Sequence, residues 1–334
     1  MTGDLERVPA IRFRGAGGLE VIELAEIDVR PPGVGEVTVE VVAAGLNRAD
    51  LLQRRGLYPA PPGSAADVPG LELSGRVVAH GPLAGAHPLG APVMAIVGGG
   101  AMAGKVTLHE RELLAVPAGL ELIAAAAIPE VFLTAWDALG QADLRAGQTV
   151  LVHAAASGVG TAALQLARIC GARPLATTRS AAKVGRVIEQ GAAAQDVILL
   201  EDGRFASRVM ARTGRGADVI LDCVGGAYLE ENLRALAPGG RLVMIGTLGG
   251  ATGSLPIGMM LGKRAQVIGS VMRSRPLEEK MALAQRAGRE LVPLFSTPGG
   301  LRPVVDRVMK MADCAAAHEV MEANDTVGKI VLIW

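Results

Sequence analysis

The chain has 334 residues, 50% of them hydrophobic, and its 33 lysines and arginines are balanced by 33 aspartates and glutamates. The length suggests two domains, and the zero net charge offers no general attraction for nucleic acid or an anionic membrane. Every long apolar stretch has polar breaks and the N-terminus mixes charges with apolar residues, so we expect neither a membrane span nor a signal peptide.

The first third of the chain is expected to be rich in β-strands. Residues 36–42 alternate polar and apolar side chains, which is the pattern of a half-buried strand. Further strands are expected at residues 75–79 and 91–97. Three consecutive glycines at 98–100 interrupt this pattern.

From about residue 120 the pattern changes to alternating helices and short buried strands. Alanine-rich helical segments at 122–128 and 131–139 come first. The expected strands are then 149–154, 174–178, 218–223, 241–246 and 266–269, and the expected helices are 158–170, 180–190, 205–212 and 228–236, with a turn at 238–240. Repeated strand–helix–strand units with short connections indicate an α/β fold with a parallel sheet covered on both faces.

The C-terminal segment is expected to return to the first domain. After about Arg273 two helical runs precede a terminal strand at 328–333, and this strand needs a sheet to join. We expect it to join the N-terminal β-rich domain, which would then be discontinuous. The predicted domains are residues 1–125 with 271–334, and residues 126–270.

A turn of small residues after the strand at 149–154 indicates a dinucleotide site. Ser157, Gly158, Val159 and Gly160 begin a helix directly after a buried strand. Backbone N–H groups and the positive helix end would there face a pyrophosphate, which bulky side chains would hold away. The glycine fingerprint is incomplete, because Ala155 and Ser157 stand where glycines are expected.

The residues after the second strand favour NADPH over NADH. NAD sites place an acidic residue there to bind the ribose hydroxyls. Here the strand ends at Thr178-Arg179, with Lys183 close by, and no acidic residue occurs between Asp143 and Glu189. A 2′-phosphate is attracted by such cations and hydroxyls. The alternative is that Arg179 and Lys183 are solvated surface charges.

Several motifs together resemble the zinc-independent quinone oxidoreductases of the medium-chain dehydrogenase/reductase superfamily, the zeta-crystallin-like group. They lie at residues 44–58, 70–75, 150–168, 221–226 and 328–331. The segments 44–58 and 221–226 are similar to the branch that contains the tumour-suppressor-inducible quinone oxidoreductase. The resemblance covers about residues 17–332 and implies a GroES-like catalytic domain, a Rossmann NADPH-binding domain and usually a homodimer.

The resemblance also predicts that no metal is bound. Zinc-dependent relatives carry a cysteine near the position of Asn47 and a histidine at that of Leu71, whereas this chain has no cysteine before Cys170. Zinc needs three or four N, S or O ligands, and the histidines at 80, 87 and 109 have no thiolate companions. The three cysteines are far apart and fit a reducing cytoplasm as buried small side chains.

By matching motif, the resemblance implies two groups of site residues. Asn47 and Tyr58 would line the nicotinamide and substrate cleft. The residues expected to contact the cofactor are Asn47, Thr134, Ser157, Gly158, Val159, Thr178, Arg179, Lys183, Gly246, Thr247, Leu248, Ser270, Val271 and Met272. The chain departs from the branch at Ile198, at Thr326 and at Gly104-Lys105, which bears on cofactor affinity and the substrate mouth.

These features lead to a hypothesis of direct hydride transfer from NADPH to a quinone or related conjugated carbonyl compound. The Tyr58 hydroxyl, the Asn47 amide or water would meet the product oxyanion. Alternatively, the Tyr58 ring packs on the proline-rich loop after it, and Asn47 stabilises its own turn. Glu72 is expected to be a buried structural carboxylate, and His153 a core residue.

Two rival functions use the same scaffold. The first is reduction of enones or enoyl thioesters. The second is a non-catalytic NADPH-binding protein, such as a structural or RNA-binding relative. The balanced charge and the aromatic content of 2% argue against nucleic acid as a partner, so a small-molecule substrate is expected.

Overall fold

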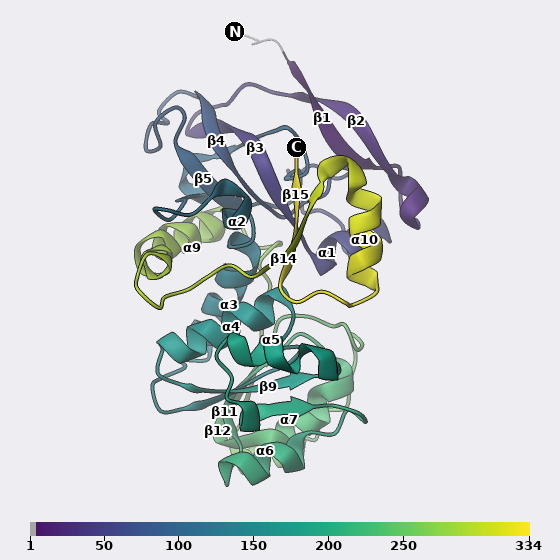
Figure 1. Ribbon diagram of the computed structural model, residues 1–334, viewed down its shortest axis with the longest axis vertical. Coiled ribbons are helices and arrows are strands. Elements are labelled where there is room, and N and C mark those ends of the chain that lie inside the picture. Colours follow the sequence, from purple (N-terminus) through teal and green to yellow (C-terminus); the bar gives the residue numbers. More distant parts are fainter. Residues whose placement is uncertain (1–4) are drawn as a thin grey trace. The chain divides into compact units, whose positions relative to one another are not determined.

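The computed structural model of the protein describes residues 5–334, which divide into two compact units (Figure 1). The first unit combines residues 5–130 with 272–334, and the second contains residues 131–271. Helix α3 (Pro129–Gln141) begins in the first unit and continues in the second. The sequence patterns had placed these limits at residues 125/126 and 270/271.

A seven-stranded sheet is the centre of the first unit. Its strands lie in the order β14-β15-β3-β4-β5-β7, and β6 pairs with β3 off this path. A second, two-stranded sheet pairs β1 (Glu6–Phe13) with β2 (Ile22–Val29). The strands of the large sheet are β3 (Glu36–Leu46), β4 (Glu72–His80), β5 (Pro92–Ile96), β6 (Lys105–His109), β7 (Leu113–Ala115), β14 (Val305–Lys310) and β15 (Lys329–Ile333).

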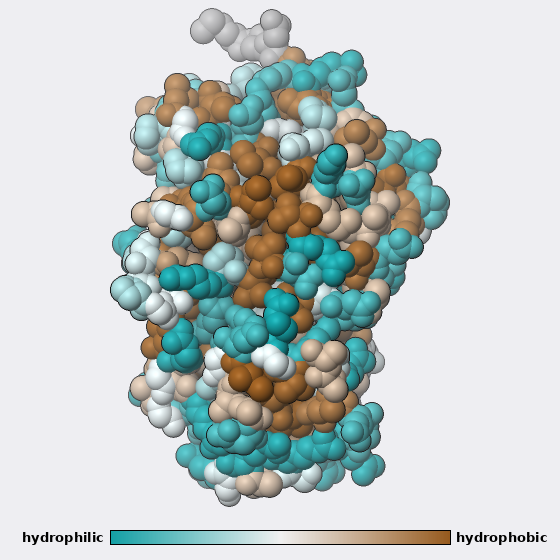
Figure 2. All heavy atoms as spheres, in the orientation of Figure 1, coloured by the Kyte–Doolittle hydropathy of each residue, from teal (hydrophilic) through white to brown (hydrophobic). Residues whose placement is uncertain are grey.

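The terminal strand β15 lies between β14 and β3. It runs antiparallel to β3, with Ile330 opposite Leu46, and parallel to β14. The prediction that the terminal strand returns to the N-terminal β-rich segment is therefore confirmed. On the face shown in Figure 2, apolar side chains gather over β14 and β15. Val308 of β14 is 44% exposed, and Trp334, directly after β15, is 39% exposed.

Four helices belong to the first unit besides the start of α3. They are α1 (Arg48–Arg54), α2 (Leu122–Ala125), α9 (Leu277–Glu290) and α10 (Cys314–Glu322). Alternate residues of β3, such as Val39 and Val41, pack in one core cluster with Met321 of α10. This alternation places one face of β3 in the core, which is why the strand could be predicted from its sequence.

The second unit is a parallel α/β sheet in the order β10-β9-β8-β11-β12-β13. Figure 1 shows α4 and α5 on one side of this sheet and α6 and α7 on the other. The strands are β8 (Thr149–Val152), β9 (Arg173–Thr178), β10 (Val197–Leu199), β11 (Ala217–Asp222), β12 (Leu236–Met244) and β13 (Gln266–Gly269). The helices are α4 (Gly158–Ile169), α5 (Val184–Glu189), α6 (Ala206–Thr213), α7 (Leu229–Ala235) and α8 (Ile257–Lys263).

Two local predictions in this unit were wrong. The turn expected at 238–240, between a helix and the strand at 241–246, instead lies within β12, which pairs with β11 on both sides of an irregular register. Gly239 has a φ of +76° there, so the residues typical of a turn form a bulge. The helix expected at 180–190 is instead a 3-10 turn, Ala181–Lys183, followed by α5, and the Ser180 side chain does not cap it.

Candidate active site

The turn between β8 and α4 allows close approach of the backbone. Ser157 precedes α4, and its Oγ accepts the Gly160 N–H at 3.1 Å. A Cβ on Gly160 would lie 2.6 Å from the Ala154 carbonyl oxygen, so only glycine lets the helix pack this closely on the strand. The first N–H groups of a helix have no intrahelical acceptor, so Gly158 and Val159 are placed where an anion is stabilised.

The left-handed residue of this turn is Ala154, with a φ of +46°. The glycine-like positions were expected at Ala155 and Ser157. In the structure Ala155 is buried and Ser157 is the exposed helix cap. The bend therefore occurs one residue before the expected position, in a conformation that side chains rarely adopt.

The residues expected at the adenosine end follow β9. Thr178 is buried at the end of this strand, and its Oγ1 accepts the Ser180 N–H at 3.2 Å. Arg179 comes next and is exposed, and Lys183 ends the 3-10 turn that precedes α5. The carboxyl end of β9 therefore carries a hydroxyl and two cations within six residues of chain, 178–183.

Tyr228 is a residue of this end that the sequence did not reveal. Its ring lies edge-on to His153 and tilted against Phe205, with centroids 5.0 Å and 5.2 Å away. Burial raises the pKa of the Tyr228 hydroxyl, and the nearby Arg179 guanidinium opposes that shift. Arg179, which follows β9, therefore lies close enough to Tyr228, which comes after β11, for its charge to affect the Tyr228 hydroxyl.

His153 is confirmed as a core residue. It is 2% exposed, and its Nε2 lies 2.7 Å from Asn232 Oδ1 while its Nδ1 lies 2.9 Å from Thr177 Oγ1. Asn232 Nδ2 donates to Asp222 at 2.9 Å, so its Oδ1 is the acceptor and His153 Nε2 carries the proton. Burial lowers the pKa of His153 to about 4, so the ring is neutral and holds β8, β9 and α7 together.

The residues expected at the nicotinamide end follow β12 and β13. Thr247 and Leu248 are exposed after β12, and a Cβ on Gly246 would lie 2.9 Å from the Cys223 carbonyl oxygen. Ser270 Oγ accepts a hydrogen bond from Gln141 Nε2 at 3.0 Å. Val271 is exposed and is the last residue of the second unit, whereas Met272 is buried and belongs to the first unit. The carboxyl ends of parallel strands are where such folds bind ligands.

Thr134 on α3 has a buried hydroxyl without a partner. Among the residues that the structure describes, no group hydrogen-bonds to its Oγ1. A buried hydroxyl left unpaired costs about 1–3 kcal/mol. This atom thus fits the expectation that Thr134 faces a polar ligand, such as a nicotinamide cofactor.

In the first unit, Asn47 starts α1 and joins it to the sheet. Its backbone N–H donates to Asp50 Oδ2 at 2.8 Å, and Asp50 Oδ1 accepts the Gly70 N–H at 3.0 Å. Its side-chain Nδ2 donates to Glu72 Oε1 at 3.0 Å and to the Gly45 carbonyl at 3.1 Å. Both amide hydrogens are thus donated within the protein, which favours the reading of Asn47 as a residue that stabilises its own turn.

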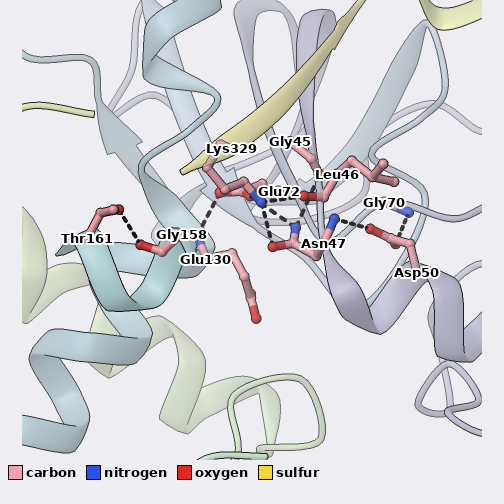
Figure 3. Close-up of polar contacts among 10 residues, drawn as sticks. All are labelled: Gly45, Leu46, Asn47, Asp50, Gly70, Glu72, Glu130, Gly158, Thr161 and Lys329. Carbon is pink, nitrogen blue, oxygen red and sulfur yellow. Dashed lines mark hydrogen bonds and ion pairs between the residues drawn. The ribbon is translucent and has the colours of Figure 1, made fainter. Parts of the chain in front are cut away.

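Lys329 completes this network from the terminal strand (Figure 3). Its Nζ donates to Asn47 Oδ1 at 2.6 Å and to the Leu46 carbonyl at 2.6 Å, and lies 2.7 Å from Glu72 Oε1. Lys329 is 3% and Glu72 0% exposed. All three ammonium hydrogens therefore have an acceptor, as a buried cation requires.

Tyr58 packs against Arg273 rather than only against its own loop. The guanidinium lies over the Tyr58 ring, 5.1 Å from the centroid, and donates to the Tyr58 carbonyl at 2.9 Å. Arg273 is 4% exposed and also donates to the Gly98 carbonyl at 2.7 Å and to Gln53 Oε1 at 2.6 Å. Burial raises the pKa of the Tyr58 hydroxyl, so it is a neutral donor at pH 7.

Glu130 is a third acidic residue linked to this network, besides Asp50 and Glu72. Its backbone N–H donates to Glu72 Oε2 at 2.8 Å, and its own Oε2 is buried with no hydrogen-bond partner among residues 5–334. Burial, reinforced by the Glu72 carboxylate, raises the pKa of Glu130 to about 8. The carboxyl is therefore mostly protonated at neutral pH. Burial also raises the pKa of Asp50, to about 6.

Across residues 5–334, no group of three or more His, Cys, Asp or Glu side chains could hold a metal ion. Cys314 is buried, Cys223 is half-buried and Cys170 is exposed, so the expectation of buried cysteine side chains is wrong for Cys170. In the same part of the chain, no helix has both the length and the apolar character needed to cross a membrane.

Comparisons with known proteins give the family. The alcohol dehydrogenase GroES-like domain model matches residues 33–118, and the zinc-binding dehydrogenase model matches residues 158–287. A quinone oxidoreductase of Pseudomonas aeruginosa is 33% identical over 97% of this chain and 98% of its own. The chain belongs to the quinone oxidoreductase group of the medium-chain dehydrogenase/reductase superfamily. It is an oxidoreductase of that superfamily, and its GroES-like domain and Rossmann-type sheet imply a nicotinamide cofactor.

Solved structures of this superfamily resemble the whole chain. A quinone oxidoreductase from Pseudomonas syringae pv. tomato matches with a TM-score of 0.86 and 28% identity, covering 98% of this chain and 100% of its own. The CurK enoyl reductase matches with a TM-score of 0.84 and 28% identity, covering 98% and 99%. The structural relatives of this medium-chain oxidoreductase thus include both a quinone oxidoreductase and an enoyl reductase.

The positions that depart from the branch lie in different surroundings in this oxidoreductase. Ile198 is 1% exposed in β10 and packs in the core of the second unit. Lys105, expected to alter the substrate mouth, forms an ion pair with Glu6. Gly104 lies against Pro9, and Thr326 is half-buried before β15.

Lys329, Arg273 and Glu130 are the functional-network residues that sequence reasoning missed, and Glu72 was noted without its partners. One signal could have found Lys329, because it begins the otherwise apolar strand β15 and a charge at a buried strand position needs a partner. Glu72 begins β4 and is buried, so it needs such a partner too.

Proposed function

We propose that this protein reduces quinones or related conjugated carbonyls with NADPH, by direct hydride transfer and without zinc. The observation that carries the proposal is the end of β9, where Thr178, Arg179 and Lys183 stand and an NAD site would have an acidic residue. The relationship to the quinone oxidoreductases supports the acceptor class. When bound, the dinucleotide supplies the hydride.

The residues of the second unit would bind and orient this cofactor. Ser157, Gly158 and Val159 would hold the pyrophosphate, because they form the N-terminus of α4. Thr178, Arg179 and Lys183 would surround the 2′-phosphate. The nicotinamide end would be lined by Thr134, Gly246, Thr247, Leu248, Ser270, Val271 and Met272.

The residues of the first unit would act on the acceptor. The neutral Tyr58 hydroxyl is the donor proposed for the developing oxyanion, and Arg273 fixes the Tyr58 ring and main chain. Asn47, with both amide hydrogens donated to Gly45 and Glu72, would act by holding α1. A quinone accepts hydride readily, so the proposal requires no Lewis acid, and no ligand set for zinc is found in residues 5–334.

A second candidate is reduction of enones or enoyl thioesters. The similarity to the CurK enoyl reductase favours it, with a TM-score of 0.84 over 98% of this chain. The same hydride donor and oxyanion donor would serve a conjugated thioester carbonyl. The two candidates differ in the acceptor alone.

A spectrophotometric panel tests these proposals. NADPH and NADH oxidation would be followed with quinones, enones and enoyl thioesters, before and after chelator treatment. We expect NADPH with a quinone to be fastest and the chelator to have no effect. Faster oxidation of NADH, or loss of activity with chelator, would contradict the cofactor or the zinc-free assignment.

The phosphate assignment has its own matched pair of variants. Arg179→Ala should raise the KM for NADPH at least tenfold and leave that for NADH nearly unchanged, because a charge-assisted bond to the 2′-phosphate is lost. Arg186→Ala is the control, since Arg186 is also exposed but pairs with Glu189 on α5. Equal KM values for the two variants would disprove the assignment.

We further propose that the protein is a cytoplasmic homodimer that associates through β13. This strand is at the edge of the six-stranded sheet, where backbone groups lack a neighbouring strand. Val267 on β13 is 39% exposed, and Ile257 and Leu261 on α8 are 60% and 68% exposed. Adjacent exposed apolar side chains of this kind are typical of protein interfaces.

A further inference from the structure

The contacts within the fold do not explain why residue 130 carries a buried carboxyl group. Its backbone N–H supports Glu72, but its side chain extends away from the Lys329–Glu72–Asn47 network (Figure 3). Its Oε2 is buried and has no hydrogen-bond partner within residues 5–334. An unpaired buried carboxyl oxygen destabilises the fold, so a structural role alone would favour an apolar residue here.

The surroundings keep this carboxyl neutral. Lys329, the nearest source of positive charge in the network, already donates to Leu46, Asn47 and Glu72. The carboxylates of Glu72 and Asp50 disfavour a further negative charge, and burial acts in the same direction. The titratable or charged groups that interact with the Glu130 carboxyl are Glu72 on β4, Asp50 on α1, Lys329 on β15, Lys280 on α9, Arg273 and Tyr58.

We propose that Glu130 is the proton donor to the reduced acceptor. This inference rests on the proposed function, in which the dinucleotide is the reductant and is oxidised by loss of a hydride. The acceptor, once it has received the hydride, needs one proton. The Oε2–H bond of Glu130 breaks, an O–H bond forms on the acceptor oxygen, and the carboxylate left behind recovers its proton from water.

Tyr58 and Glu130 then have separate tasks. The Tyr58 hydroxyl, whose pKa is raised by burial, stabilises the oxyanion as a hydrogen-bond donor but gives up its proton only with difficulty at pH 7. Glu130, with a pKa of about 8, is close to the working pH, where a general acid is most effective. The electrostatic effect of Glu130 on Tyr58 places the two groups in the same neighbourhood.

The test is the pH dependence of kcat in Glu130→Gln and in a matched control. A donor must be protonated, so wild-type kcat should fall as the pH rises through about 8. Glu130→Gln has nearly the same shape but no acidic proton, and should lower kcat by about 100-fold and abolish this limb, with NADPH affinity unchanged. Glu112→Gln is the control, because Glu112 is also a buried glutamate with a raised pKa but accepts the His109 N–H.

Two results would overturn the proposal. One is a Glu130→Gln protein that keeps the wild-type kcat and the same limb. The other comes from wild-type protein alone and does not depend on the variant's folding: infrared spectra in which no protonated carboxyl band is lost between pH 7 and 9. A wild-type protein with no activity on any acceptor would instead refute the proposed function, and the infrared band would still report the state of Glu130.

Discussion

Replacing Lys329 by methionine tests whether the buried network holds the first unit together. Methionine keeps most of the apolar stem and removes the ammonium group, which has three acceptors 2.6–2.7 Å away. The Glu72 carboxylate would remain at 0% exposure with only the Asn47 amide and the Glu130 N–H as donors. The Leu46 carbonyl and Asn47 Oδ1 would lose their shared donor.

The size of the effect follows from which charges are buried. Breaking a buried ion pair by removing one partner costs about 3–5 kcal/mol, because the remaining charge is uncompensated. For a domain of roughly 200 residues, 1 kcal/mol corresponds to a change in Tm of about 2–4 °C. We therefore expect Lys329→Met to lower the Tm of the first unit by about 6–20 °C. A second substitution, Glu72→Gln, should recover part of that loss.

The assay is thermal unfolding followed by calorimetry, which can separate the transitions of the two units. Lys105→Met is the matched control, because Lys105 pairs with Glu6 at the surface, where the side chains are 21% and 56% exposed. Such pairs contribute about 0–1 kcal/mol. Equal Tm changes in the two variants would refute the reasoning, since burial would then make no difference.

Three further predictions concern the second unit. Gly160→Ala places a Cβ 2.6 Å from a backbone oxygen, so a fluorescence titration should show at least tenfold weaker NADPH binding, whereas Gly185→Ala, with no atom within 4 Å, should bind normally. The folded pKa of His153, about 4, lies below its unfolded value of about 6.5, so the unfolded chain binds more protons between these values. The free energy of unfolding should therefore decrease by up to about 3 kcal/mol as the pH falls from 6.5 to 4, and His153→Gln should flatten that slope in urea titrations; an unchanged slope would exclude His153 as the cause. Val267→Lys on the exposed edge β13 should convert a dimer to a monomer in light scattering, and an unaltered mass would place the interface elsewhere.

The parallel sheet could be predicted because its strands are short, continuous and buried. The strand expected at 218–223 is β11 (Ala217–Asp222), and the strand expected at 266–269 is β13. In the first unit the sequence did not reveal β1 or β2. Pro9 interrupts the alternating pattern of β1, and every residue of β2 is at least partly exposed, so neither segment shows the regular alternation that marks a half-buried strand.

The candidate site was predicted where it follows one local motif and missed where it depends on topology. Ser157 and Gly158 form a contiguous turn, so their spacing carries the information. Asn47 and Lys329 are 282 positions apart, and only the antiparallel pairing of β15 with β3 brings them together. Arg273 reaches the Gly98 carbonyl across 175 positions in the same way. Local patterns contain no record of such pairs.

The position of Lys329 in the chain has a consequence for folding. Residues 131–271 form the second unit from one continuous segment, so that unit can fold before the rest of the chain is complete. The first unit is complete only after β15 has been made, because this strand lies between β14 and β3 in its sheet and carries the cation that Asn47 and Glu72 contact. Burying Glu72 earlier would leave its charge uncompensated, which disfavours a closed but incomplete first unit. The network that would position α1 is therefore completed only when β15 is in place, and the residue that stabilises the site also makes its formation depend on a strand 282 positions after Asn47.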